Sequence, residues 1–103
     1  MRLELDILLV RLWTLDSERI RSSLRAAGLG ARITRVDFSA SVYAALTRTR
    51  FHAAIFDPST PRLSLATLGS ILREHRQEIP IVILGREDDV GPQLAIALRG
   101  LRN

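Results

Sequence analysis

Short runs of apolar residues alternate along the chain with segments of helical periodicity. The runs lie at residues 7–10, 31–36, 52–56 and 79–84. Runs of this length are too short for a helix and are typical of strands in a parallel sheet that is buried on both faces. Only the second run carries charged residues, Arg32 and Arg35. This pattern predicts that residues 31–36 form a strand at the edge of the sheet.

Apolar residues recur at intervals of three and four between these runs, which predicts four helices. Asp16 and Ser39 are the expected N-caps of the first two, and Gly28 is the expected end of the first. The third helix is expected to end near His75, and Pro92 suits the first turn of the fourth. The residues expected to face the core are Ile20, Leu24, Ala27, Val42, Ala45, Leu46, Leu65, Leu68, Ile71, Leu72, Val90, Leu94, Ala97, Leu98 and Leu101.

A strand followed by a helix, four times over, predicts an α/β fold with a doubly wound parallel sheet and helices on both faces. The last strand would then have one unpaired edge, which is an aggregation hazard in a free protein. We therefore expect either that the chain is part of a longer protein or that a partner, including a second copy, covers this edge or the face of the fourth helix.

Composition narrows the class of protein. With 103 residues, 47% of them hydrophobic, the chain is expected to form one domain with its own core. It has no cysteine, which excludes disulfides and thiolate metal sites. No apolar run approaches the roughly 20 residues of a membrane span. The first residues include two acids and lack the features of a secretory signal, so a cytoplasmic location is expected.

The net charge of +4 comes from arginine alone, since all 15 basic residues are Arg. A basic stripe interleaved with aromatic residues would indicate a nucleic-acid binder. The five aromatic residues do not cluster, however, and the arginines are spread along the chain. This distribution favours solvated helix faces, and an arginine-driven nucleic-acid binder remains an alternative.

The candidate chemistry begins where the third apolar run ends in Asp57, which is followed by Pro58 and Pro61. In an open parallel sheet, ligands bind just beyond the carboxyl ends of the strands. A single carboxylate at this point is where a phosphate-accepting group would lie.

The chain resembles the receiver domains of bacterial response regulators over essentially all of residues 1–103. Asp57 and Pro61 have the spacing of the phosphoacceptor and loop proline of that family, and residues 7–10, 35–37, 44–46 and 79–83 are similar to it. The resemblance implies one receiver-like domain with a flavodoxin-like fold and strand order 2-1-3-4. The fifth strand of the family is expected to lie outside this chain.

The departures from the family pattern affect its phosphorylation site. Receivers hold Mg²⁺ with an acidic pair after the first strand, where this chain has Arg11 and Leu12. Their phosphate-binding Ser or Thr corresponds to Gly85, and a glycine after the loop proline is replaced by Leu65. The lysine of the family lies beyond the chain. Asp57 is therefore expected to be inactive, with no metal and no cofactor.

Arg11 should emerge from the first strand beside Asp57 on the third, where its guanidinium would take the place of the metal. We therefore expect an ion pair between Arg11 and Asp57. Arg62 and Arg86 are possible competitors for the same carboxylate.

Three further features have open or neutral interpretations. Leu12 and Trp13 either plug the vacant site or form an exposed anchor for a partner. Residues 87–89, Glu-Asp-Asp, either offer metal ligands or form a solvated loop before the next helix. His52 and His75 have no Ser or Cys partner at a recognisable spacing, so no catalytic constellation and no enzyme is predicted.

The sequence as a whole favours a non-phosphorylatable receiver-like module for protein interaction or dimerisation in a bacterial signalling protein. The resemblance is greatest to receivers that precede PAS, GGDEF or EAL domains, which implies a cyclic-di-GMP protein that regulates type IV pili or motility. The main alternative is an atypical receiver that is phosphorylated on Asp57 in a two-component phosphorelay.

Overall fold

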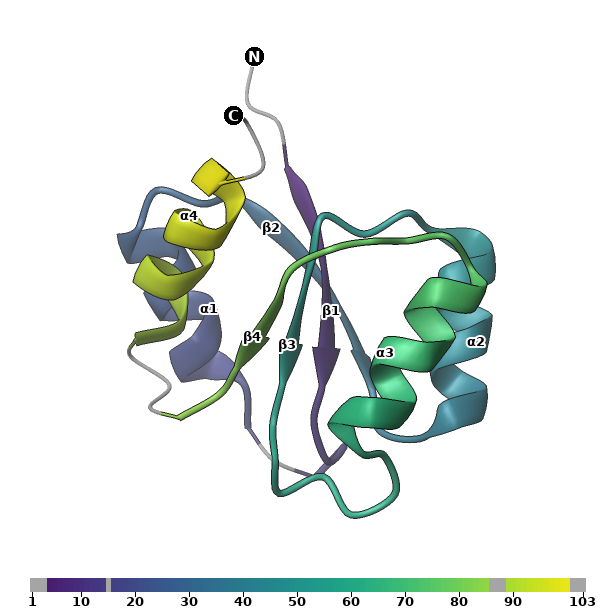
Figure 1. The fold of residues 1–103 in the computed structure, drawn as a ribbon. Helices are drawn as coiled ribbons and strands as arrows, with labels where there is room; N and C mark the ends of the chain where they lie inside the picture. Colours follow the sequence, from purple (N-terminus) through teal and green to yellow (C-terminus); the bar gives the residue numbers. More distant parts are fainter. Residues whose placement is uncertain (1–3, 15, 86–88, 101–103) are drawn as a thin grey trace.

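Strands and helices alternate throughout the computed structural model, which describes residues 4–14, 16–85 and 89–100 (Figure 1). The strands are β1 (Leu5–Val10), β2 (Ala31–Val36), β3 (Ala53–Phe56) and β4 (Ile81–Ile83). The helices are α1 (Glu18–Ala26), α2 (Ser39–Arg48), α3 (Leu65–Glu74) and α4 (Val90–Gly100). The predicted order of elements is confirmed.

The four strands form one parallel sheet in the order β2-β1-β3-β4, as predicted. β1 lies between β2 and β3, with Val10 opposite both Val36 and Phe56. Helices cover the sheet on both faces, so the four residues from Ile7 to Val10 are fully buried. This register also aligns the ends of β1 and β3, where the candidate site lies.

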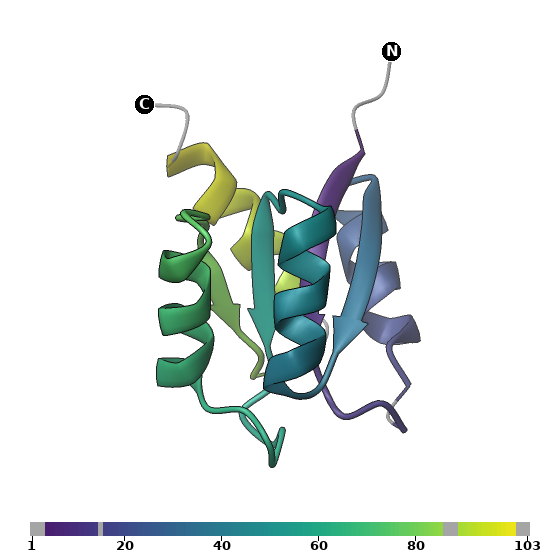
Figure 2. The same ribbon diagram turned by 90° about the vertical axis from the view of Figure 1, so that its right-hand side faces the viewer.

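The helices form two layers of two. α2 and α3 cover one face of the sheet, and α1 and α4 cover the other (Figures 1 and 2). Successive strand residues point to opposite faces, so Leu8 and Val10 contact the α2/α3 layer while Ile7 and Leu9 contact the α1/α4 layer. The apolar runs of the sequence are thus divided between two cores.

The starts of the first two helices differ from the prediction. Ser17 is the N-cap of α1, although the Asp16 carboxylate still accepts the N–H of Glu18 at 3.0 Å. Ser39 is the first residue of α2 and not its N-cap. The N-cap is Phe38, whose N–H donates to the Ser41 hydroxyl at 3.3 Å.

The ends of α1 and α3 agree with the prediction. Gly28 has φ +77°, a conformation that only glycine adopts without strain, and it follows the end of α1. His75 is the C-cap of α3, and its Nδ1 lies 3.0 Å from the Ile71 carbonyl oxygen.

The fourth strand is shorter and less buried than the run at 79–84 indicated. Val82 and Leu84 are buried against the α1/α4 layer, but Ile83 points to the opposite face and is 47% exposed. The reason is that α3 is the last helix described on that face, and it does not reach over the outer flank of β4. Leu65, in the first turn of α3, is also exposed rather than buried.

The face of the sheet on which α4 lies determines whether a strand following α4 could pair with the outer edge of β4. The crossovers through α2 and α3 step from β2 towards β4, whereas the crossover through α1 steps in the reverse direction. Since such crossovers share one hand, a helix in the α1 layer leads back towards β2. A parallel strand reached through α4 would therefore not join the open edge of β4. Val90, Leu94, Ala97 and Leu98 of α4 face the core as predicted, and Leu101 lies outside the described residues.

The contact between α1 and α4 is close enough to require glycine. The N–H of Gly91 donates to the Ser23 hydroxyl at 2.9 Å, and a Cβ on Gly91 would collide with the Ser23 carbonyl group. The two helices therefore meet backbone to backbone.

We expect Gly91→Ala to lower the free energy of unfolding by about 2 kcal/mol, since the added methyl group forces the helices apart. Gly69→Ala in α3 is the matched control, because a Cβ there would lie 3.6 Å from the flexible Arg73 side chain. It should be neutral or stabilise by up to about 1 kcal/mol. Urea denaturation of both variants measures the difference, and equal effects would contradict the close contact.

Candidate functional site

The candidate site lies at the carboxyl ends of the two central strands. Arg11 directly follows β1, and its N–H donates to the Val36 carbonyl of β2 at 2.9 Å. Asp57 directly follows β3, and its N–H donates to the Val10 carbonyl at 2.9 Å. The hydrogen-bond ladder thus continues one residue past each strand and holds Arg11 and Asp57 next to each other at the ends of β1 and β3.

The side chains of Arg11 and Asp57 form a buried ion pair. Arg11 Nε lies 3.3 Å from Asp57 Oδ2, and each residue is 7% exposed. Little water reaches such a pair, so the attraction is screened less than at the surface. The guanidinium supplies positive charge directly at the acidic side chain.

The second oxygen of Asp57 is held by its own loop. Asp57 Oδ1 accepts the backbone N–H of Ser59 at 2.9 Å and the Ser59 hydroxyl at 2.7 Å. An aspartate that binds the N–H two residues ahead forms an Asx turn. Ser59 was not singled out from the sequence, although an Asp followed by Pro-Ser is a recognisable signal for this turn. Both carboxylate oxygens are therefore engaged.

Thr60 is a second residue that fixes the loop after β3, and it too was not singled out from the sequence. Its N–H donates to the Asp57 carbonyl at 3.0 Å, and its buried hydroxyl donates to the Val10 carbonyl at 3.4 Å. The loop after β3 is thus tied to β1 by side chain as well as backbone. Its role here is to position Asp57.

The remaining predicted site residues lie around this pair at different depths. Leu12 is half-buried, and Gly85 is exposed with open space where a side chain would project. Arg62 is exposed and forms no ion pair with Asp57. Arg86, Glu87 and Asp88 lie outside the described residues, and Asp89, the last residue of the acidic run, is exposed directly before α4.

Trp13 points outwards. Its side chain is 59% exposed, and the guanidinium carbon of Arg35 lies 4.4 Å from the centroid of its ring. This is a cation–π contact, which holds the indole over the end of β2. Trp13 is therefore exposed and does not plug the site at Asp57, and its role as an anchor for a partner stays a prediction.

The residues at Asp57 do not fit a magnesium ion. Mg²⁺ requires oxygen ligands in near-octahedral geometry. The two positions after β1 instead provide a guanidinium and an aliphatic side chain, and the guanidinium already faces Asp57 Oδ2. Within residues 4–14, 16–85 and 89–100, no group of three or more His, Asp or Glu side chains could hold a metal. None of the described helices is long and apolar enough to cross a membrane.

The two histidines have structural partners away from Asp57. His52 Nδ1 accepts the N–H of Asp6 at 2.9 Å. The ring of His75 lies 5.2 Å from that of Tyr43, which donates a hydrogen bond to Glu74 at 2.7 Å. The hydrogen bond to Glu74 raises the pKa of Tyr43, and this contact joins α2 to α3.

A solved structure resembles this chain. It is the receiver domain of the sensor histidine kinase PA1611 from Pseudomonas aeruginosa PAO1, which has a magnesium ion coordinated in its active-site cleft. The TM-score is 0.62 and the identity is 25%, over 81% of this chain and 68% of that one. No protein-family model and no curated protein matches the sequence. The comparison supports a receiver-like fold.

We expect Arg11→Met to lower the free energy of unfolding by about 3 kcal/mol, because it leaves Asp57 buried without its counter-charge. Adding Asp57→Asn removes the charge but keeps an acceptor for Ser59, so the double variant should lose only about 1 kcal/mol. Urea denaturation measures both. Arg62→Met is the exposed control, and a cost for Arg11→Met no larger than for this control would contradict a stabilising buried pair.

Proposed function

We propose that this chain is a receiver-like interaction module that does not accept a phosphoryl group on Asp57. The observation that carries the proposal is the ion pair between Arg11 and Asp57 at 3.3 Å. The receiver-like fold supports a role as a signalling module. The composition of the site supports the loss of phosphorylation.

Phosphoryl transfer to a carboxylate needs a free oxygen to attack and a metal ion to neutralise the charge on the phosphoryl oxygens. Here Arg11 and Ser59 occupy the two oxygens of Asp57. A divalent cation approaching the same point would meet the positive guanidinium. In this proposal Arg11 provides a permanent charge that phosphorylation and metal binding do not regulate.

The parent protein is inferred from the resemblance of the sequence. We assign the module to a cytoplasmic signalling protein with PAS, GGDEF or EAL domains, where cyclic-di-GMP controls type IV pili or motility. A module that is not switched by phosphorylation contributes by binding other proteins or a second copy of itself.

The open edge of β4 supports self-association. Ile83 is 47% exposed on this strand, and Ile96 is 68% exposed on α4. Strand edges with apolar side chains pair readily with another strand. Since a strand following α4 would not reach this edge, we propose that a second copy of the chain covers it.

We expect Mg²⁺ with beryllofluoride, which mimics a phosphoryl group, to leave the amide NMR signals of Asp57 and Ser59 unchanged. We also expect Mg²⁺ alone to leave Tm unchanged. The variant Arg11→Asp with Leu12→Asp restores an acidic pair after β1, so Mg²⁺ should raise the Tm of this variant.

Asp57→Asn serves as the control, because it removes the acceptor while keeping the loop hydrogen bonds. A saturable response of the unmodified protein that disappears in Asp57→Asn would establish a working receiver and reject the proposed inactive site.

If β4 mediates self-association, Ile83→Glu should raise the dissociation constant of the dimer by about tenfold or more, since it puts a charge at an apolar contact. Sedimentation equilibrium measures this constant. Phe38→Glu, at a side chain 41% exposed beyond the opposite edge strand, should have no comparable effect. A protein that stays monomeric at high concentration would rule out self-association.

A further inference from the structure

We propose that the open edge of β2, together with the groove between β2 and α1, binds an extended acidic segment of a partner protein. This proposal deepens the interaction role proposed above by naming one docking surface and the chemistry of its ligand. It does not involve the side chains of Arg11, Asp57 or Ser59.

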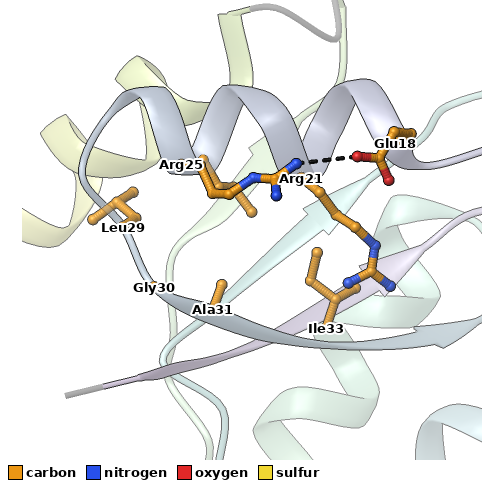
Figure 3. A pocket seen from close by; sticks show the side chains of 8 residues that line it. Glu18, Arg21, Arg25, Leu29, Gly30, Ala31 and Ile33 are labelled. Atoms are coloured by element: carbon orange, nitrogen blue, oxygen red, sulfur yellow. Dashed lines mark hydrogen bonds and ion pairs between the residues drawn. The ribbon is translucent and has the colours of Figure 1, made fainter. Parts of the chain in front are cut away.

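The groove runs along the side of the sheet that α1 covers. It has a volume of about 350 Å³, with Leu29, Ala31 and Ile33 at its base and Arg21 and Arg25 on its α1 side (Figure 3). The three apolar residues are only partly buried. They therefore offer a surface on which small apolar side chains of a ligand would pack.

The backbone beside the groove has hydrogen-bonding groups that β1 does not use. The N–H of Leu5 donates to the Gly30 carbonyl at 2.8 Å, and that of Arg11 to the Val36 carbonyl at 2.9 Å. Strand residues direct their backbone groups to alternate sides, so even-numbered residues of β2 face β1. Ala31 and Ile33 then present their N–H and C=O groups at the open edge. An added peptide strand would satisfy these groups.

The charge along this edge selects an acidic ligand. Figure 3 shows Arg21 extending from α1 towards Ile33, whereas Arg25 is turned towards Glu18, with which it pairs at 3.1 Å. Among the described residues Arg21 forms no ion pair. Arg35 lies further along the same side of β2, next to Trp13. A glutamate or aspartate side chain on a ligand would complement Arg21.

The alternatives to an acidic peptide fit less well. A second copy paired through β2 would bring the arginines of one edge against those of the other. A nucleic acid would meet the arginines but would leave the alternating N–H and C=O groups without strand partners. Arg32 does not contribute to this surface, because it points to the opposite face and pairs with Asp6 at 3.1 Å.

The test uses a capped peptide of about six residues in which every second side chain faces the groove, with valine and glutamate alternating at those positions and threonine at the others. Titration into this chain should shift the amide NMR signals of Ala31, Ile33 and Arg35 and slow the hydrogen exchange of Ile33. It should also change the fluorescence of Trp13, which is the single tryptophan. The same peptide with lysine in place of each glutamate should not bind.

Arg21→Glu should weaken binding of the acidic peptide about tenfold, because it replaces attraction by repulsion. Arg19→Glu is the matched control, since it makes the same charge change on the exposed part of α1 outside the groove, and it should change affinity less than about twofold. Methylating alternate amides of the peptide should abolish binding.

Absence of binding, equal loss in Arg21→Glu and Arg19→Glu, or equal binding of the methylated peptide would overturn the proposal. So would preferential binding of a single-stranded DNA oligonucleotide to the same residues, which would identify a nucleic-acid site instead. None of these outcomes alters the response to Mg²⁺ and beryllofluoride, so failure of this surface and failure of the inactive Asp57 site are distinguished.

Discussion

The ion pair of Arg11 and Asp57 is the contact on which the carboxyl end of this sheet depends. Two charges that are 7% exposed compensate each other across this pair. The backbone places them one residue past β1 and β3, two strands that are already hydrogen-bonded to each other. The carboxylate at the start of the loop after β3 is therefore held by Arg11 from β1 and by Ser59 from within the loop.

Much of the fold was accessible from the sequence, because strand runs and helical periodicity report burial directly. The helix starts were less accessible. Whether Ser17, Phe38 or Ser39 acts as an N-cap depends on local backbone angles, which residue type alone does not determine. The exposure of Ile83 was missed for a different reason. An apolar run looks the same whether the following helix covers the strand or crosses to the other layer.

The candidate site shows a similar division. The position of Arg11 beside Asp57 follows from the strand order, which the family resemblance implied, and from the place of Arg11 directly after an apolar run. Ser59, the second partner of the Asp57 carboxylate, had a local sequence signal, the Asp-Pro-Ser order of an Asx turn, which was overlooked. The orientation of Trp13 had none, since it depends on Arg35, which is brought near only by the pairing of β1 with β2. Contacts between distant segments are the part that a single sequence does not reveal.

The backbone contact between Gly91 and Ser23 gives the α1/α4 layer a mechanical property. Helices separated by side chains can slide past each other by small rotamer changes. Helices that touch at the main chain have no side chains between them that could adjust in this way. α1 forms one wall of the groove beside β2, and α4 packs behind β4. The two outer strands of the sheet, although they never meet, are thus backed by two helices that touch each other directly. A displacement of α1 at one edge would be carried as a whole to the other.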